Sequence, residues 1–447
     1  MRVLFVHQNF PGQYKHLAPA LAQRRDCEVV ALAINRQPTP ETMKVVYYEP
    51  KRGSSQSLHP WVSDLETKVI RGEAAALAAA QLNREGFRPD VICAHPGWGE
   101  ALFLKDVWPD TKLLSFIEFY YEARGSDFAF DPEYADTSLA SLCRLRMKNA
   151  NHLLTLMASD WAISPTRFQR DQVPALFHDK MSVIHDGIDT RLVRPNPAAT
   201  LTLEKAGVTL SRADEVITFV NRNLEPYRGF HVFMRALPEI QKRRPNAWVL
   251  ILGGDEVSYG AQPPKGQTYR QILMAEVGAT LDMSRIRFLG RVPYGHFLKL
   301  LHISAAHVYL TYPFVLSWSM LEAMAAECLV IGSATEPVQE VIADGENGLL
   351  VDFFSAEAIA DAIDRVLDDP DRLQPLRARA RQTVIERYDL NTVCLPRHLA
   401  LVDAVAEGRL PPQGLDAPVS PTAAAMRRAL QAKREPEHRR HGSRRRR

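Results

Sequence analysis

One stretch of the chain, Val308–Val351, restricts the possible folds more than any other. It contains two short apolar runs with the composition of buried strands, Val308–Thr311 and Cys328–Gly332. Between these runs, Ser317–Ala326 consists of good helix formers with apolar residues at helical spacing. Two parallel strands joined by a helix form a βαβ unit, which binds ligands at the carboxyl ends of its strands. The stretch therefore predicts an α/β fold with a ligand site at the loop before the helix.

The first turn of this helix carries groups that suit a bound diphosphate. The backbone N–H groups of Ser317, Trp318, Ser319 and Met320 lack intrahelical acceptors, and a helix N-terminus attracts negative charge. The two serine hydroxyls can cap the helix or donate to phosphate oxygens. Glu322, one turn further on, can accept hydrogen bonds from ligand hydroxyls such as those of a ribose.

The sequence SMLEAMAAECLVIGSATEPVQEVIADGENGLLV, which begins at Ser319, resembles the donor-site segment of the family 4 retaining glycosyltransferases, which have the GT-B fold. This family usually carries two glutamates here, separated by seven residues. Glu322 matches the second glutamate, whereas the first falls at Phe314. In the family the first glutamate lies near the donor sugar, so the departure at Phe314 concerns the recognition of that sugar.

Two arginines, Arg222 and Arg228, flank a loop after the strand-like run Val216–Asn221. Cleavage of a sugar–diphosphate bond develops negative charge on the leaving phosphate, and paired arginine donors match phosphate oxygens. In the resembling family an arginine and a second cation occupy these places and clamp the diphosphate. The resemblance therefore implies donor-binding and catalytic roles for both residues, with a catalytic role for Glu322 as well. Spacing alone fits two arginines in a solvated loop better than it fits a clamp.

Two cations at the diphosphate can replace a metal ion, and the sequence offers no convincing carboxylate site for one. Asp255 and Glu256 follow two glycines and fit a turn at the end of a strand better than a metal site. We therefore expect neither a metal nor a cofactor, with a nucleotide-sugar as the donor substrate.

The chain begins as nucleotide-binding α/β folds do, with a strand (Arg2–His7), a glycine-bearing loop and a helix (Tyr14–Arg24). In the resembling family this loop lies at the cleft between two domains, near the donor phosphate and the acceptor. The resemblance implies that Gly12 binds the donor and that His7 and Asn9 bind the acceptor. The alternative is that His7 and Asn9 simply end a strand and form a turn.

Two further strands of the first half end in polar residues. Val91–His95 ends at His95, and Lys112–Ile117 is followed by Glu118. Such positions lie on the ligand edge of a parallel sheet. Many members of the resembling family have a histidine near the second of these strand ends, close to the reacting sugar. We therefore expect His95 and Glu118 to bind the acceptor, with a catalytic role for Glu118; the alternative is loop structure and capping.

At 447 residues the chain suits two domains, and the strand–helix alternation restarts at Val216. The run HDGIDTRLVRP at residues 185–195 resembles the segment by which the family crosses between domains. We therefore expect a GT-B α/β fold, with two Rossmann-like doubly wound domains facing across a cleft. The expected boundaries are 1–193 for an acceptor-binding domain, 194–388 for a nucleotide-sugar-binding domain, 389–407 for a helix returning to the first domain, and 408–447 for a disordered basic tail.

Charge separates the tail from the body. The net charge is +3, yet ten Lys/Arg and only two Glu lie from Arg427 to Arg447, which leaves 45 basic and 50 acidic residues before them. A mildly acidic body argues against a nucleic-acid-binding protein. The tail could instead hold the protein at an anionic membrane surface, since membrane-linked acceptors are common in the resembling family. The alternative is a solvated end without a role.

The five cysteines are widely spaced and form no CxxC pair in the sequence, which indicates reduced thiols in a cytoplasmic protein. The sequence has no run of about 20 apolar residues, so it predicts no membrane-spanning helix.

The resemblance implies an enzyme that moves a hexose from a nucleotide-sugar to a glycan, lipid-linked or small-molecule acceptor, with retention and without a metal. The alternatives are a GT-B nucleotide-sugar epimerase or hydrolase, and a non-catalytic GT-B subunit.

Overall fold

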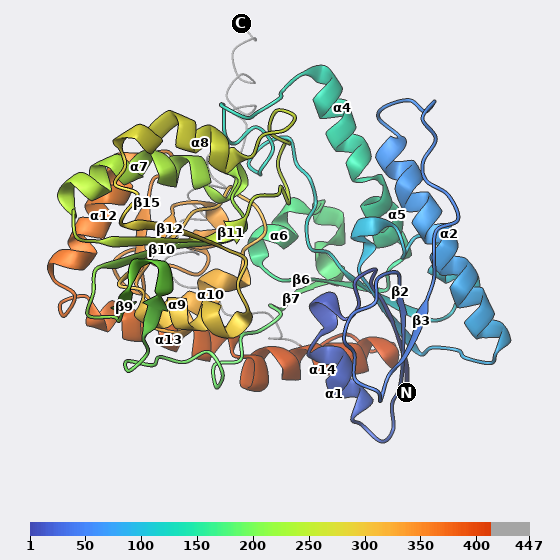
Figure 1. Ribbon diagram of the computed structural model, residues 1–447. Helices are drawn as coiled ribbons and strands as arrows, with labels where there is room; N and C mark the ends of the chain where they lie inside the picture. Colours follow the sequence, from blue (N-terminus) through green and yellow to red (C-terminus); the bar gives the residue numbers. More distant parts are fainter. Residues whose placement is uncertain (413–447) are drawn as a thin grey trace, which may run out of the picture.

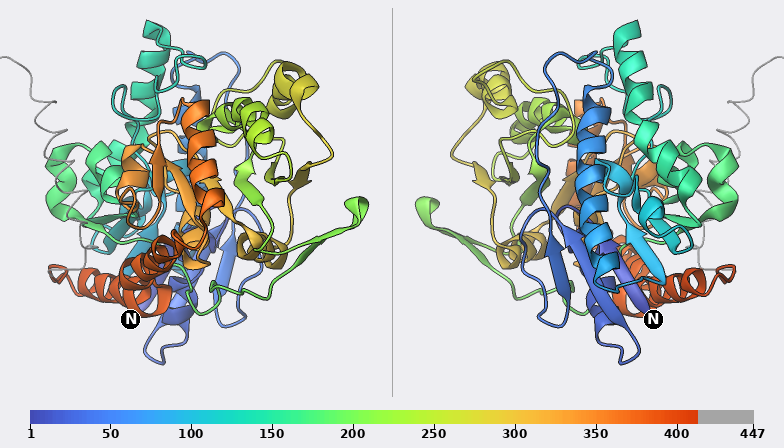
Figure 2. Two further views of the ribbon diagram at one scale, coloured as in Figure 1. Left: turned by 90° about the vertical axis from the view of Figure 1, so that its left-hand side faces the viewer. Right: turned by 90° about the vertical axis from the view of Figure 1, so that its right-hand side faces the viewer.

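The structure, a computed structural model, describes residues 1–412. Its two main sheets are entirely parallel and doubly wound, with strand orders β3-β2-β1-β4-β5-β6-β7 and β12-β11-β10-β13-β14-β15 (Figure 1). The predicted pair of doubly wound α/β units is therefore confirmed. A third, two-stranded sheet is an antiparallel hairpin of β8 (Leu201–Leu203) and β9 (Val208–Leu210), which projects from the body (Figure 2).

The first sheet uses residues from the N-terminal half of the chain. Its strands are β1 (Arg2–Val6), β2 (Glu28–Ala33), β3 (Lys44–Tyr47), β4 (Val91–Ala94), β5 (Lys112–Phe116), β6 (Trp161–Ser164) and β7 (Met181–Val183). Its helices are α1 (Leu17–Ala22), α2 (Ser63–Arg84), α3 (Leu104–Val107), α4 (Leu139–Lys148), α5 (Ala150–Ala158) and α6 (Arg167–Gln172). Helices α1 and α2 cover opposite faces, which explains why β1 and β4 are apolar without alternation.

The second sheet repeats this plan. Its strands are β10 (Val216–Asn223), β11 (Trp248–Gly254), β12 (Ile286–Gly290), β13 (Ala306–Tyr309), β14 (Val330–Ser333) and β15 (Leu349–Val351). Helices α7 (Phe230–Arg243), α8 (Tyr269–Val277) and α12 (Ala356–Asp368) cover one face, and α9 (Tyr294–Ile303), α10 (Trp318–Ala325) and α13 (Gln374–Tyr388) cover the other, while the short helix α11 (Glu336–Gln339) follows β14.

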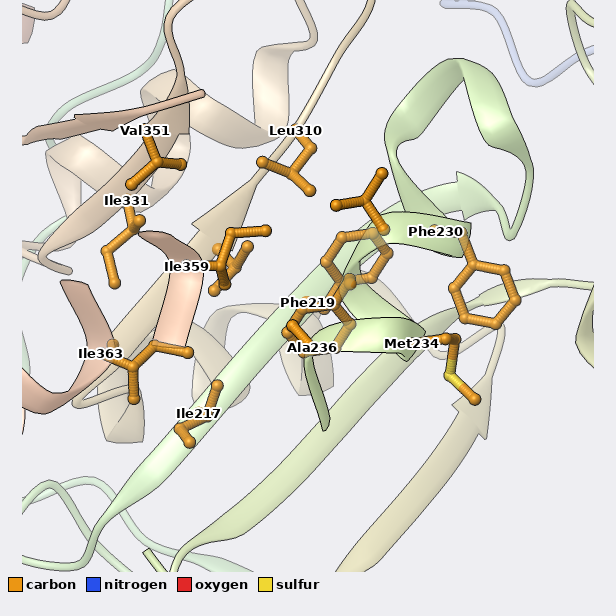
Figure 3. Packing of buried hydrophobic residues seen from close by; sticks show 14 of the residues in the cluster. Ile217, Phe219, Phe230, Met234, Ala236, Leu310, Ile331, Val351, Ile359 and Ile363 are labelled. Atoms are coloured by element: carbon orange, nitrogen blue, oxygen red, sulfur yellow. The ribbon is translucent and has the colours of Figure 1, made fainter. Parts of the chain in front are cut away.

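The core on the α7 and α12 face is the larger of the two that flank the second sheet. Figure 3 shows Phe219 of β10, Phe230 of α7 and Ile359 of α12 converging on it. The Phe219 ring stacks on that of Phe233, with centroids 4.4 Å apart. This packing fixes the start of α7, and with it the loop between β10 and α7, which carries Arg228.

The described chain ends on the first unit. A π-helical turn (Leu390–Cys394) leads into α14 (Leu395–Ala406), whose apolar side chains pack in the same core as β1. Asp403 of α14 also accepts a hydrogen bond of 2.8 Å from Arg24 Nη1. Most of the basic tail lies outside the described residues, and the domain boundary near residue 193 stays a prediction. No helix within residues 1–412 is long and apolar enough to cross a membrane.

One helix differs from its predicted extent. The predicted helix Tyr14–Arg24 is a 3-10 turn, η1 (Gly12–Tyr14), followed by the short helix α1. Pro19 explains the late start, because proline is tolerated in the first helical turn but breaks a helix interior. Helices α4 and α5 are separated at Asn149, whose side-chain amide is hydrogen-bonded to the backbone of Tyr121 at both N and O.

Candidate functional site

The residues predicted from sequence gather at the switch point of each sheet. In the first sheet the chain order reverses between β1 and β4, and in the second between β10 and β13. Ligands of open α/β sheets bind outside the carboxyl ends of strands at such points. His7 and His95 follow β1 and β4, whereas Arg228 and Ser317 lie in the loops that follow β10 and β13.

Arg228 is held by the two loops at the second switch point. Its side chain is buried, and Nη1 donates to Thr311 Oγ1 at 2.7 Å and to Val315 O at 3.0 Å. The next residue, Gly229, has a φ of +67°, and a Cβ there would lie 2.3 Å from the Leu310 side chain. Only glycine lets this turn approach so closely. The guanidinium is therefore fixed at the end of the sheet.

Phe314, at the position of the family's first glutamate, belongs to an aromatic cluster beside Arg228. Its ring centroid lies 4.6 Å from that of Phe119, 4.9 Å from Tyr259 and 5.4 Å from Tyr227. The guanidinium carbon of Arg228 lies 5.8 Å from the Phe314 centroid and 5.2 Å from the Tyr259 centroid, within the range of cation–π attraction. Since Phe119 follows β5, the cluster joins the two units.

The start of α10 is capped by the chain itself. Ser317 N donates to the Tyr309 hydroxyl at 2.9 Å, Ser319 N to Ser317 Oγ at 3.3 Å, and Met320 N to Ser317 O at 3.3 Å. The Met320 side chain is fully buried in the core. Among residues 1–412, the Trp318 amide is the one of these four without an acceptor. Of the four amides predicted to bind phosphate, only that of Trp318 can therefore donate to a ligand without giving up a hydrogen bond within the protein.

Glu322 lies where α10 meets the first unit. Its Oε1 accepts a hydrogen bond of 2.7 Å from the Tyr294 hydroxyl, so a ligand hydroxyl competes with Tyr294. Burial raises the pKa of Glu322, against the effects of this hydrogen bond and of the Lys15 charge. Lys15 Nζ, from the first unit, lies 3.9 Å from the Trp318 ring centroid, and Trp318 Nε1 donates to Asp186 Oδ2 at 2.8 Å.

His7, His95 and Glu118 meet at the end of the first sheet, and Gln13 of η1 connects two of them. His7 Nε2 lies 2.7 Å from Gln13 Oε1, and Gln13 Nε2 donates to Glu118 Oε1 at 3.1 Å. His95 Nε2 lies 3.6 Å from the other carboxylate oxygen of Glu118. Gln13 therefore donates to one oxygen of the Glu118 carboxylate, and the His95 ring lies close to the other without a hydrogen bond.

Backbone donors fix the tautomers of both histidines. Nδ1 of His7 accepts from Asn9 N at 3.0 Å, and Nδ1 of His95 accepts from Gly97 N at 3.2 Å, so each neutral ring carries its proton on Nε2. Burial lowers the pKa of His7 to about 3 and keeps its ring neutral. Burial alone would raise the pKa of Glu118, but the nearby His95 ring and the hydrogen bond from Gln13 hold it below the usual value.

Aromatic packing holds this cluster in place. The His95 ring stacks on that of Trp98, with centroids 4.4 Å apart, and the His7 ring meets the Trp98 ring edge-on at 4.9 Å. A Cβ on Gly12 would lie 2.4 Å from the His7 ring, so glycine is required for the loop to close over it. Trp98 is partly exposed and forms a wall of the cluster.

Two predicted residues stand apart from these clusters. The Asn9 side chain is occupied, because its Oδ1 accepts a hydrogen bond of 2.6 Å from Asn35 Nδ2; only its backbone supports His7. Arg222 lies on β10 and is exposed, between the buried Asn221 and Asn223. Within the part of the chain that the structure describes, its guanidinium has no hydrogen-bond or ion-pair partner. Of the two arginines predicted to form a clamp, only Arg228 is therefore held in place by hydrogen bonds.

The carboxylates after β11 are paired with arginines. Asp255 Oδ2 lies 2.6 Å from Arg270, and Glu256 Oε2 lies 2.7 Å from Arg291. Nowhere in residues 1–412 do three or more His, Cys, Asp or Glu side chains gather in a way that could hold a metal ion. The negative charge of both carboxylates is therefore balanced by the protein itself.

Sequence reasoning missed Gln13, Trp98, Lys15 and Tyr294. Gln13 and Trp98 lie in the connections that follow β1 and β4, so their position on the ligand edge of the sheet was a usable signal. Tyr294 and Lys15 carried no such signal, because each reaches the α10 region through the tertiary fold, Tyr294 across 28 residues and Lys15 from the other unit.

Family models match both halves of the chain. The model described as Glycosyl transferase family 4 group matches residues 25–193, and the model described as Glycosyl transferases group 1 matches residues 204–383. A D-inositol 3-phosphate glycosyltransferase from Corynebacterium efficiens is 32% identical over 341 residues, which are 72% of this chain and 73% of the relative. A similarly named enzyme from Corynebacterium glutamicum is 31% identical over 43% of this chain and 44% of the relative.

Solved structures share the fold over most of the chain. An Anabaena protein, HepE, crystallised with UDP and glucose, superposes with a TM-score of 0.65 at 15% identity, covering 90% of this chain and 100% of HepE. A sucrose-phosphate synthase from Thermosynechococcus elongatus superposes with a TM-score of 0.65 at 17% identity, covering 97% of this chain and 100% of the synthase.

Proposed function

Because the chain belongs to the family 4 glycosyltransferases, retaining enzymes of the GT-B fold that use nucleotide-sugar donors, we propose that its donor binds at the end of the second sheet and its acceptor at the end of the first. Arg228 holds the donor diphosphate, with the exposed Arg222 joining it when the donor is bound. Glu322 accepts from hydroxyls of the nucleoside ribose in place of Tyr294.

The chemistry required of the donor side is stabilisation of a leaving diphosphate. The buried guanidinium of Arg228 donates hydrogen bonds from Nη1 to Thr311 and Val315, which hold it in one orientation. Its remaining N–H groups are therefore preoriented. Cleavage places negative charge beside this cation, which is the arrangement that lowers the barrier without a metal ion.

The acceptor side requires hydrogen-bond acceptors for hydroxyl groups. The Glu118 carboxylate, kept ionised by its N–H neighbours, accepts a hydrogen bond from the attacking hydroxyl and orients it. His7 and His95 complete the walls with Trp98, and Gly12 lets the loop close over them. A hydroxyl-rich acceptor, of the kind that relatives named for inositol phosphate use, suits this set of groups.

One observation carries the proposal. Phe119, the residue after Glu118, packs on Phe314 at 4.6 Å, and Phe314 packs beside the Arg228 guanidinium. The carboxylate of one sheet and the cation of the other therefore flank the same aromatic contact. Transfer needs the acceptor hydroxyl and the leaving phosphate near the same anomeric carbon, and this arrangement places the groups proposed to bind them side by side.

A donor panel tests the proposal. UDP-, GDP- and ADP-sugars are first screened by thermal shift, and those that bind are incubated with and without inositol phosphate and simple glycosides. Acceptor-dependent release of nucleoside diphosphate, with a retained anomer seen by NMR, is the expected result. Donor consumption that is independent of every acceptor would favour the epimerase or hydrolase alternative. Binding of no nucleotide-sugar would favour the non-catalytic one.

The basic tail supports a narrower proposal about location. Ten Lys/Arg from Arg427 to Arg447 would attract the protein to anionic lipid by about 1 kcal/mol per residue near the surface. We expect the full chain to sediment with anionic vesicles at low salt and to be released at high salt. A chain ending at Gly408 that sedimented equally would remove the tail from this role.

A further inference from the structure

The segment between β5 and α4 follows a strand of the first sheet but packs on the second unit. We call residues 124–137 the strap. The ring of Phe130 lies 5.1 Å from that of Tyr312 and 5.2 Å from that of Phe353, and the ring of Tyr134 lies 5.8 Å from that of Tyr269 in α8. Figure 1 shows this teal segment, just before α4, beside α8.

A buried aspartate anchors the strap. Asp131 Oδ2 accepts from the Tyr312 hydroxyl at 2.7 Å and lies 3.0 Å from His231 Nε2. The side chains of Asp131 and His231 are 3% and 2% exposed. A carboxylate buried to this degree is costly unless donors satisfy it, so the three side chains form one interdependent unit.

A second strap carboxylate reaches the loop that carries Arg228. Asp127 Oδ2 accepts a hydrogen bond of 2.8 Å from the hydroxyl of Tyr227, the residue before Arg228. Tyr227 and Tyr312 also join the two loops to each other, with ring centroids 4.6 Å apart and a backbone hydrogen bond from Tyr312 N to Tyr227 O at 3.0 Å.

Both tyrosines stand next to the groups that fix the guanidinium. Tyr227 precedes Arg228, and Tyr312 follows Thr311, whose hydroxyl accepts from Arg228 Nη1 at 2.7 Å. The strap thus contacts each of the two loops that hold the Arg228 guanidinium. Each contact is made to a tyrosine that is one residue away from Arg228 or from its hydrogen-bond acceptor Thr311. A shift of either tyrosine displaces Arg228 or its hydrogen-bond acceptor.

We propose that Asp131 is a positioning residue for Arg228, so that a segment of the first unit completes the donor site of the second. The inference rests on the proposed role of Arg228 in binding the diphosphate. Asp131 acts through Tyr312 on the loop after β13 and through His231 on the start of α7, and Asp127 acts through Tyr227 on the loop after β10. Neither carboxylate contacts the diphosphate itself.

The strap offers a matched control in Glu133. This residue pairs with Arg235 through two hydrogen bonds of 2.6 and 2.8 Å, and Arg235 also pairs with Glu276. The pair joins the strap to α7 as Asp131 does, but both of its side chains are partly exposed, and Arg235 lies one turn further along α7 than His231. Exposed pairs of this kind contribute little.

The test measures nucleotide binding by calorimetry in the full-length chain. UDP, GDP and ADP are titrated into the wild type, and the one that binds most tightly is titrated into Asp131→Asn, Tyr312→Phe and Glu133→Gln. Loss of an oriented charged hydrogen bond predicts a roughly tenfold weaker Kd for Asp131→Asn. Tyr312→Phe is expected to weaken binding in the same direction, and Glu133→Gln less than about twofold.

A double mutant separates positioning from stability. In an Arg228→Ala background, Asp131→Asn should cause no further loss of affinity, because it acts through the side chain already removed. Wild-type affinity in folded Asp131→Asn, or additive losses in the double mutant, would overturn the inference. If Asp131→Asn does not fold, Tyr312→Phe and Tyr227→Phe decide by the same criteria. A wild type that binds none of the three nucleotides would overturn the proposed function and this role with it.

Discussion

The ends of the two sheets are built alike and charged oppositely. Each lies at a switch point, and each has a glycine turn with positive φ, Gly12 in the first and Gly229 in the second. The first end places N–H groups beside the Glu118 carboxylate, whereas the second packs the Arg228 guanidinium against hydroxyl, carbonyl and aromatic groups. The fold therefore sets where a ligand lies, and the loops set which chemistry it meets.

The two charges also differ in their access to solvent. The Glu118 side chain is 37% exposed, whereas Arg228 is 5% exposed. A buried cation with fixed partners is preorganised for a charge that develops beside it, which suits the donor side. A partly exposed carboxylate can exchange its partners for incoming hydroxyls, which suits the acceptor side.

The largest expected effect comes from the buried cation. Arg228→Ala should reduce turnover by roughly 10²–10³-fold, because a fixed contact to the leaving phosphate is lost. Release of nucleoside diphosphate is the readout, with circular dichroism to verify folding. Arg222→Ala is the comparison: its side chain has no partner within residues 1–412, so any loss of rate reports ligand contact rather than folding. Wild-type turnover in Arg228→Ala would remove Arg228 from the donor site.

The second largest effect is expected at the Glu118 carboxylate, where Glu118→Gln should reduce turnover by roughly 10²-fold. The pKa of Glu118 is held below its usual value, so the wild type keeps the active ionised form until the pH falls below the ordinary range for glutamate. A pH–rate profile should therefore show an acid limb that is absent in the variant. An unchanged acid limb would mean that another group is responsible for it.

Substitution of Phe314 tests whether packing in the aromatic cluster stabilises the fold. Phe314→Glu restores the usual family residue but places a carboxylate among the Phe119, Tyr227 and Tyr259 rings. We expect the free energy of unfolding to fall by about 3 kcal/mol, since packing is lost and a charge is buried. Urea denaturation measures this, with Phe314→Leu as the milder control. A stable Phe314→Glu with higher activity would contradict this account.

Asp186, which lies between the two ends, should give a smaller and pH-dependent effect. Its Oδ1 has no hydrogen-bond partner among the described residues, and burial raises its pKa from 3.8 to about 7. Because the folded pKa is raised, the stability from the protonated carboxyl is full below 3.8 and is lost as the pH rises through about 7. Asp186→Asn should therefore gain about 1–2 kcal/mol over the wild type at pH 8 but not at pH 4, by urea denaturation. Equal differences at both pH values would assign the effect to packing.

The smallest expected effect is that of metal removal. The carboxylates after β11 are paired with Arg270 and Arg291, so full activity should persist after dialysis against a chelator. Addition of Mg²⁺ or Mn²⁺ should leave the rate unchanged. Activity that disappears with the chelator and returns with either ion would show that the donor phosphate requires a cation.

The hydrophobic periodicity of the sequence predicted the two α/β units. It did so because, in parallel α/β folds, the pattern of apolar residues in each strand and helix matches the pattern of burial. Strands such as β1 and β4 are apolar on both faces, and the Ser317 cap marks the start of α10. The register at the end of β10 was not predictable, because its pairing with β11 shifts between Val220 and Asn223. Such an irregularity changes which residues face the ligand, and this is where Arg222 separates from Arg228.

Long-range contacts account for the other parts of the site that sequence could not supply. Gln13, which bridges His7 and Glu118, contacts Glu118 across 105 positions of the sequence, and Asp131 contacts Tyr312 across 181 positions. Neither contact leaves a periodic signal, because each side chain lies in a loop. Phe314 was recognised as a departure from the family, but its aromatic partners became visible only in the fold.

Nucleoside diphosphate binding by the two charge variants tests the central claim most directly. Calorimetry with UDP, GDP and ADP compares the wild type with Arg228→Ala and Glu118→Gln. If the donor binds at the second sheet and the acceptor at the first, Arg228→Ala loses affinity for the nucleotide that the wild type prefers, and Glu118→Gln binds it as the wild type does while losing turnover. Equal loss of affinity in both variants, or loss in Glu118→Gln alone, would contradict this division of roles.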